Sequence, residues 1–367
     1  MNIFIVLIDY SYWPKMKYIF RYLNISFLVI FLASCSQSEF KKLGPTENKY
    51  NLTTESSLLD RSHTYQIDSL FTKGESGFFK GKNWINIFYS YFLQKNSKKG
   101  AIVISDGRTE AVVKYKEVIY DLFKNGYSVY IHDHRGQGFS ERMLPDTDMG
   151  FVDEFQFYVD DMKYFYDNFI TQNEHNKIFL LAHSMGSAIG VAYLEEYPDD
   201  FDAAAFSSPM LGLPFPTCLV VGLLARDEPE YALGNTNYDE GLVRFEENTL
   251  TGSEIRYVRM NNIFAEYPKA RLGGATYQWV NKSCNQFKII FDNIEKIETP
   301  LILFSGEEEE IVSPSSQNEF IIELNLLGKR ENGFNVPGAK HELLIEKDEI
   351  RISVMTKILD FYSEFID

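Results

Sequence analysis

Short apolar runs alternate with amphipathic stretches along this chain from residue 63 onward. Apolar runs bounded by turn residues are typical of buried strands, and the stretches between them have the period of helices. The predicted strands are residues 65–71, 84–92, 101–105, 128–132, 178–182, 203–207, 301–304 and 333–336. The predicted helices are residues 110–124, 153–170, 185–197, 314–327 and 348–365. This alternation predicts an α/β protein with a mostly parallel sheet and crossover helices, whose first two strands form an antiparallel pair.

One long segment interrupts this alternation. Residues 209–295 contain Pro-rich and aromatic stretches and a polar, Gly-bearing middle. Because they stand between one predicted strand of the sheet and the next, we expect them to form an inserted cap over the catalytic face. The core of the fold is then built from residues 63–208 and 296–367.

The amino terminus has the pattern of an export signal, which is set aside before the fold is considered. Lys17 and Arg21 precede an apolar run at residues 25–33, which is shorter than the about 20 residues of a transmembrane helix. The run ends in the letters LASC, which resemble a bacterial lipobox, so residues 1–35 are predicted to be a signal segment and Cys35 to be acylated. A plain signal peptide and an uncleaved anchor are the alternatives.

The predicted signal has two consequences. Met16 would be an ordinary start for it, which would make residues 1–15 an upstream extension. Residues 36–62 are polar and are predicted to be a tether between the anchor and the folded body. We therefore expect an exported bacterial lipoprotein that is attached to a membrane through Cys35.

Composition and charge narrow the classes of partner. Of 367 residues, 45% are hydrophobic and 15% aromatic, enough for a substantial core. The net charge of −16 disfavours nucleic acid and anionic bilayer surfaces as partners, so any membrane contact is expected to go through the anchor. The sequence does not determine the oligomeric state.

The cysteines and histidines predict no metal site. Neither a CxxC spacing nor a His/Cys cluster is present, so we expect no structural zinc. Cys218 and Cys284 would meet an oxidising compartment after export, but their spacing does not establish whether they pair. No cofactor is predicted.

Ser184 is the strongest candidate for a chemical role. It lies in the letters AHSMG at residues 182–186, between a predicted strand and a predicted helix. A nucleophile elbow has the pattern GxSxG, because small residues on both sides of the serine allow the tight turn that exposes its hydroxyl. Ala182 replaces the first glycine with the next smallest residue. The alternative is an ordinary serine in a strand-to-helix turn.

A serine nucleophile needs a base, and the base needs a carboxylate to orient it. After an elbow serine, the acid and then the histidine follow in the chain. His341 is the single histidine after Ser184 and lies in a turn-rich loop, with a surface histidine as the alternative. The acid should follow the strand at 301–304, where the four glutamates 307–310 are the candidates. Oxyanion donors are expected from the Met185 amide and from the loop 106–110.

With these residues in place, the chain resembles the monoacylglycerol lipase and bacterial lysophospholipase branch of the α/β-hydrolases. The matching segments run in the family's order and are GRTE (107–110), KY (114–115), DHRGQGFS (133–140), YVDD (158–161), AHSMG (182–186), SPM (208–210), GGATY (273–277), GEEEEIV (306–312) and GAKHE (338–342).

The resemblance implies the α/β-hydrolase fold and a role for each matched position. It implies that Ser184 is the nucleophile and His341 the base, and it assigns the acid to Glu309, with Glu in place of the family's Asp. It assigns the oxyanion amides to Arg108 and Met185. Where the lipases have His-Gly before the oxyanion residue, this chain has Asp-Gly at 106–107, so a role for that histidine does not carry over.

Together these observations predict a cofactor-independent serine hydrolase that cleaves the ester of a single-chain lipid, either a lysophospholipid or a monoacylglycerol. The same fold also hosts small-ester hydrolases and peptidases. A non-catalytic surface lipoprotein that binds lipid is the alternative outside the enzymes.

Overall fold

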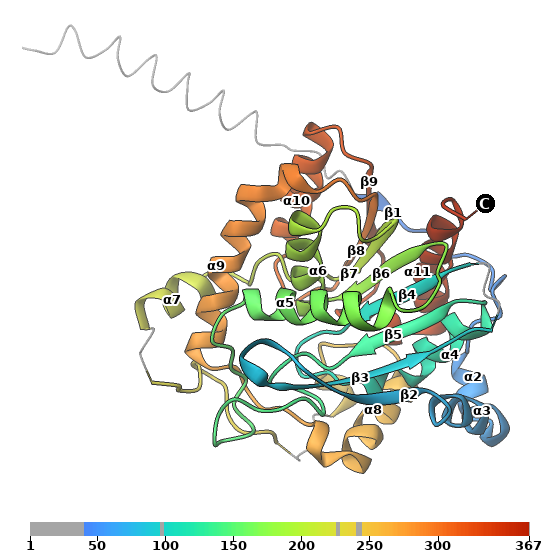
Figure 1. Ribbon diagram of the computed structural model, residues 1–367, viewed down its shortest axis with the longest axis horizontal. Helices are drawn as coiled ribbons and strands as arrows, with labels where there is room; N and C mark the ends of the chain where they lie inside the picture. The colour runs from blue at the N-terminus through green and yellow to red at the C-terminus, as the bar shows by residue number, and fades with distance from the viewer. Residues whose placement is uncertain (1–39, 96–98, 225–227, 240–243, 367) are drawn as a thin grey trace, which may run out of the picture. The chain divides into compact units, whose positions relative to one another are not determined.

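The computed structural model describes residues 40–95, 99–224, 228–239 and 244–366. Within these residues, nine strands form one sheet in the order β1-β9-β8-β7-β6-β4-β5-β3-β2 (Figure 1). The strands are β1 (Lys41–Lys42), β2 (Glu75–Lys80), β3 (Asn86–Phe92), β4 (Ala101–Ser105), β5 (Ser128–His132), β6 (Ile178–His183), β7 (Ala203–Ser207), β8 (Leu301–Gly306) and β9 (Glu331–Val336). Every pairing from β1 to β5 along this order is parallel, and β3 pairs antiparallel with both β5 and β2. This confirms the mostly parallel α/β sheet.

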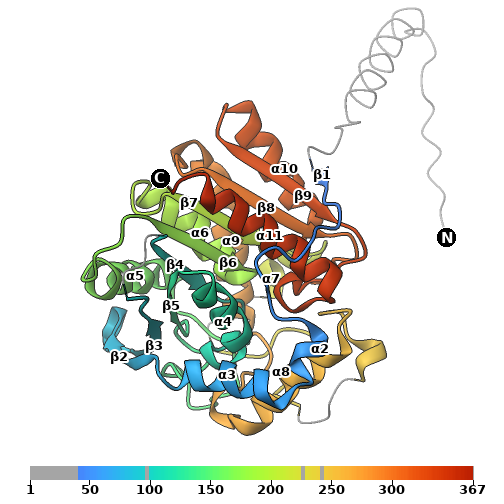
Figure 2. The same cartoon turned by 90° about the vertical axis from the view of Figure 1, so that its right-hand side faces the viewer.

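Helices cover both faces of the sheet (Figure 1 and Figure 2). The helices are α2 (Glu55–Leu58), α3 (Arg61–Phe71), α4 (Lys116–Lys124), α5 (Gln156–Phe165), α6 (Met185–Glu196), α7 (Thr217–Leu224), α8 (Glu254–Glu266), α9 (Tyr277–Asn293), α10 (Pro314–Leu326) and α11 (Asp348–Ser363). Alternate residues of a strand point to opposite faces. Accordingly, Val103 packs with the face that holds α5, α6 and α9, whereas Ile102 and Ile104 pack with the face that holds α4 and α11.

One predicted strand is wrong. Residues 65–71 lie in α3, and the strand that pairs antiparallel with β3 is β2, which the sequence pattern missed. Asp60 caps α3 by accepting a hydrogen bond from the Ser62 amide, and such a cap favours a helix start. The apolar run of this segment is not a buried strand, since Ile67 is its one fully buried member.

The predicted polar tether is also wrong over the part that the structure describes. From Phe40 onward the chain packs on the core, and Leu43 and Leu52 are buried. Thr53 donates its amide and its hydroxyl to Asp121, at 2.9 and 2.7 Å, and its carbonyl accepts from Arg351. The segment is therefore held on the core by its buried residues, although many of its other polar side chains are exposed. Residues 36–39 lie outside the described residues.

The segment between β7 and β8 holds α7, α8 and α9, and its described residues contain no strand of the sheet. It is the segment that was expected to form a cap. Cys218 of α7 and Cys284 of α9 form a disulfide with Cα atoms 5.6 Å apart. The pairing that the sequence left open is thus present, and it joins two helices of this segment.

The predicted signal segment, residues 1–35 with Cys35, lies outside the described residues. Among the residues that the structure describes, no helix is both long enough and apolar enough to cross a membrane.

Candidate active site

Ser184 occupies a strained turn between β6 and α6. Its φ of 51° and ψ of −117° fall in a region that side chains rarely adopt, and such strain is concentrated at functional sites. The turn is packed closely against the end of β4, because a Cβ atom at Gly186 would lie 2.2 Å from the Ser105 carbonyl oxygen. The glycine two positions after the serine is therefore required by space, as the elbow pattern predicts.

A chain of hydrogen bonds joins three side chains from distant parts of the sequence. Ser184 Oγ lies 2.9 Å from His341 Nε2, and His341 Nδ1 lies 2.8 Å from Glu309 Oε2. Glu309 comes from the loop after β8 and His341 from the loop after β9, so both are placed at the same edge of the parallel sheet as Ser184. The structure thus brings together the predicted nucleophile, base and acid, with a geometry in which a neutral His341 accepts the serine proton and donates to the carboxylate.

Glu309 is set apart from its three neighbours by burial. Its side chain is fully buried, whereas Glu307, Glu308 and Glu310 are exposed. Its second oxygen accepts the amides of Ile311 and Val312, at 2.8 and 3.2 Å. Burial raises the pKa of this carboxyl, but the bond and charge of His341 and the two amides outweigh it and lower the pKa below its ordinary value.

The two predicted oxyanion donors stand next to this chain. Met185 is the first residue of α6, where backbone amides have no partner within the helix. Arg108 lies in the turn after β4. This turn is held by a hydrogen bond from the side-chain amide of Gln137 to the Gly107 carbonyl and by one from the Gly107 backbone amide to the Glu110 carboxylate. The oxyanion role of the two amides stays a prediction.

A pocket of about 370 Å³ opens over Ser184 and His341. Its apolar lining comes largely from the segment between β7 and β8, including Met260, Phe264 and Leu272. Of the apolar stretch at 211–225, Leu213 lines this pocket. Leu211 is buried elsewhere in the core, and residue 225 lies outside the described residues.

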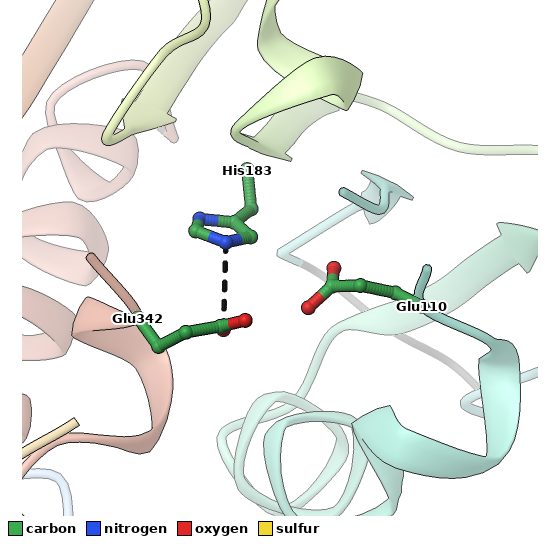
Figure 3. A group of neighbouring side chains, drawn as sticks. All are labelled: Glu110, His183 and Glu342. Carbon is green, nitrogen blue, oxygen red and sulfur yellow. Dashed lines mark ion pairs between the residues drawn. The ribbon is translucent and has the colours of Figure 1, made fainter. Parts of the chain in front are cut away.

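A buried polar cluster forms one end of the pocket, and sequence analysis missed it. Glu110, His183 and Glu342 converge there (Figure 3), and His183 Nε2 lies 3.4 Å from Glu342 Oε2. Lys114 donates to both glutamates, at 2.7 Å to Glu342. Glu110 and Lys114 are four residues apart, and this spacing is the signal that would have linked them.

The charges of the cluster compensate one another. The three acceptor groups lie within 4.8 Å, which is close enough for a metal ion, but the Lys114 ammonium already bonds both carboxylates. Burial opposes the charge of Glu342, but Lys114 and His183 hold the pKa of this carboxyl well below its usual range. Burial also lowers the pKa of His183, and the charges of Glu342 and Glu110 outweigh it and raise that pKa. The ring centroids of His183 and His341 lie 4.9 Å apart, so this cluster packs against the candidate base.

Glu342→Gln is expected to lower the free energy of unfolding by about 3 kcal/mol at neutral pH, because it leaves Lys114 buried without one of its carboxylates. The lowered pKa of Glu342 means that its contribution is present above the ordinary glutamate pKa and is lost as the pH falls through the lower folded value. The raised pKa of His183 acts in the opposite sense, with a contribution that is lost as the pH rises. Urea unfolding at acid, neutral and alkaline pH measures both effects.

The exposed Glu308→Gln is the matched control for this substitution and should unfold as the wild type does. Equal stability of Glu342→Gln and the wild type at neutral pH would show that the cluster contributes nothing to folding.

Known proteins share the sequence over most of the chain. The family model described as "Serine aminopeptidase, S33" matches residues 96–348. Lysophospholipase L2 of Escherichia coli (strain K12) is 36% identical over 274 residues, which cover 71% of this chain and 80% of that protein. Probable lysophospholipase L2 of Haemophilus influenzae is 33% identical over 299 residues, which cover 79% of this chain and 93% of that protein.

Solved structures share the fold. A soluble variant of monoglyceride lipase from Saccharomyces cerevisiae aligns with a TM-score of 0.64 at 18% identity, over 80% of this chain and 95% of that one. The monoacylglycerol lipase of Paleococcus ferrophilus aligns with a TM-score of 0.60 at 20% identity, over 76% of this chain and 98% of that one. At these identities the likeness is one of fold.

Proposed function

Since this chain belongs to the serine aminopeptidase (S33) family, within the lysophospholipase and monoacylglycerol lipase branch of the α/β-hydrolases, we propose that it is a lysophospholipase. It is a serine hydrolase that cleaves carboxylic esters of single-chain lipids. The observation that carries the proposal is the hydrogen-bonded chain Ser184–His341–Glu309 at the floor of an apolar pocket.

The geometry supports a two-step reaction. In the first step the Ser184 oxygen bonds to the ester carbonyl carbon while its proton passes to His341, and the Glu309 carboxylate stabilises the imidazolium. The Arg108 and Met185 amides hold the negative oxygen, and His341 then gives its proton to the departing glycerol oxygen. In the second step water replaces the alcohol, and the acyl-serine bond breaks to release a fatty acid and restore Ser184.

The same site is less suited to an aminopeptidase, the activity in the family description. An exopeptidase of that kind needs a carboxylate for the free amino group of its substrate. Glu110 and Glu342 line the pocket, but Lys114 bonds to both of them, so neither offers an unshared charge. The apolar lining contributed by Met260 and Phe264 favours an acyl chain instead.

A panel of substrates tests this function with the purified protein. The panel holds a lysophospholipid and a monoacylglycerol of the same acyl chain, a short ester and an aminoacyl amide. We expect the highest kcat/KM on the lysophospholipid, and enzyme inactivated by a fluorophosphonate is the control for background hydrolysis. A higher kcat/KM on the aminoacyl amide would contradict the proposal and favour a peptidase.

We also propose that the protein is exported and held at a membrane by lipid on Cys35. The basic residues Lys17 and Arg21, the apolar run that follows them and the LASC letters support this placement. The disulfide between Cys218 and Cys284 is a further support, because disulfides persist in oxidising compartments. The acidic body gives no attraction to anionic headgroups that could replace the anchor.

Cys35→Ser is expected to block acylation and to move the protein out of the membrane fraction. Acyl chains contribute about 0.8 kcal/mol per buried methylene, and two chains give stable anchoring where one is marginal. Fractionation of expressing cells and metabolic labelling with a fatty acid measure the two effects, and Ser34→Ala beside it is a control that leaves the thiol in place. Full membrane attachment of the Cys35→Ser protein would overturn the lipobox interpretation.

A further inference from the structure

The side chain of Arg108 has a position that the proposed reaction does not use. Arg108 lines the pocket over Ser184, and the Cζ atom of its guanidinium lies over the Trp279 ring, 5.0 Å from the centroid. Its Nη2 donates to the Gly273 carbonyl at 2.7 Å, whereas its buried Nε has no partner. Within the described part of the chain, no carboxylate forms an ion pair with it. The pocket therefore contains a cation that no carboxylate among the described residues pairs with.

An unpaired, partly buried cation is costly, and this chain has an excess of carboxylates to pair it with. The two glutamates that line the same pocket, Glu110 and Glu342, bond to Lys114 instead. Burial lowers the pKa of Arg108 to about 10, so the guanidinium still carries its charge at neutral pH. A bound anion would compensate this charge.

We propose that the Arg108 side chain binds the phosphate of a lysophospholipid while the amide of the same residue faces the ester. The inference rests on the proposed lysophospholipase function and deepens it. In a lysophospholipid only the glycerol unit separates the ester from the phosphate, so one residue contacts both groups. A guanidinium has the planar fork of donors that matches phosphate oxygens, and the contacts with the Trp279 ring and the Gly273 carbonyl hold it in this position. A monoacylglycerol has no anion at this position, so Arg108 selects against it.

The carboxylate of the released fatty acid is a second anion with a similar charge. If it were the natural occupant of this position, Arg108 would govern product release rather than substrate choice. The lysophospholipid phosphate and the fatty-acid carboxylate, as alternative occupants, predict different results for substrate preference and for product inhibition. The experiment therefore measures both.

Arg108→Met keeps the backbone amide and most of the side-chain length but removes the charge. We expect the ratio of kcat/KM on a lysophospholipid to kcat/KM on the monoacylglycerol of the same acyl chain to fall about tenfold or more. Any disturbance of the oxyanion amide affects both esters alike and cancels in this ratio. Assays are run on the full chain, below the concentration at which either lipid forms micelles.

Arg271→Met is the matched control. The Cζ atom of Arg271 also lies over an aromatic ring, that of Tyr238, and Arg271 also donates to a backbone carbonyl, that of Phe264, but it does not line the pocket. Its substitution should leave the ratio at the wild-type value.

Gly150→Ala is the alternative test variant if Arg108→Met does not fold. A Cβ atom at Gly150 would lie 2.5 Å from Nη2 of Arg108, so it displaces the guanidinium without removing it. We expect the ratio to fall in the same direction and by less.

An unchanged ratio in the folded Arg108→Met protein, or an equal fall in Arg271→Met, would overturn the inference. The inference would also fail if Arg108→Met relieved inhibition by the free fatty acid and left the ratio unchanged. That result would mean that Arg108 binds the product. If the wild type hydrolysed no lysophospholipid, the proposed function itself would fail. The failure of the two proposals is thus distinguishable.

Discussion

Ser184→Ala is expected to lower kcat for ester hydrolysis by about a million-fold, the loss found when the serine of a comparable triad is removed. The hydroxyl is the group that Nε2 of His341 meets at 2.9 Å, and alanine leaves no atom able to form the acyl-enzyme. The residual rate would come from the oxyanion amides and from substrate binding. Hydrolysis of a lysophospholipid by the purified variant, followed as fatty acid release, measures the loss.

Ser187→Ala is the matched control for this variant. Ser187 lies in the first turn of α6, three residues after Ser184, and its buried hydroxyl has no hydrogen-bond partner among the described residues. Its removal should leave kcat close to the wild-type value. Both variants should unfold at the wild-type temperature. Substantial activity in folded Ser184→Ala protein would mean that the nucleophile lies elsewhere in the chain.

The elements that the sequence predicted best are those defined by local pattern. The bounds of β4, β5 and β7 agree with the predicted runs, because each is a short apolar segment that is buried on both faces between turn residues. The elbow at residues 182–186 is local in the same sense. It consists of a serine between small residues, at the junction of a buried strand and a helix, and the structure places the strained φ there.

The errors occur where distant partners decide the structure. The segment at 40–62 is polar, and nothing within it reveals that Thr53 bonds to Asp121 or that Arg351 bonds to both of these residues. Polar composition alone therefore predicted a solvated tether. The strand that was predicted at 65–71 failed for a local reason, since Asp60 caps a helix that begins just before this apolar run.

In the active site, too, the features set by local pattern were predicted and those set by distant contacts were not. The chain order of serine, acid and histidine was sufficient to bring Ser184 and His341 together as candidates, and the family resemblance selected Glu309 among four glutamates. The position of the Arg108 side chain depends on Trp279 and Gly273, more than 160 residues further along the chain, so the sequence indicated a role for its amide alone.

Glu309→Gln is expected to lower kcat by about ten-thousand-fold, the loss found when the acid of a serine triad is replaced by its amide. The buried carboxylate accepts Nδ1–H of His341 at 2.8 Å and so holds the tautomer in which Nε2 faces Ser184. An amide at this position also presents a donor, which favours the wrong tautomer. Glu309→Asp should recover part of the activity, because it restores an acceptor on a shorter side chain.

Glu308→Gln and Glu310→Gln are the matched controls, since both side chains are exposed in the same loop and should retain wild-type kcat. The pH profile adds a second readout. The pKa of Glu309 is lowered, so its carboxylate stays ionised through mild acid, and acidification over that range should not remove the acceptor that orients His341. If Glu308→Gln or Glu310→Gln proved the more damaging substitution, the acid would be that residue, and the loop would have to rearrange by one position during the reaction to bring it to His341.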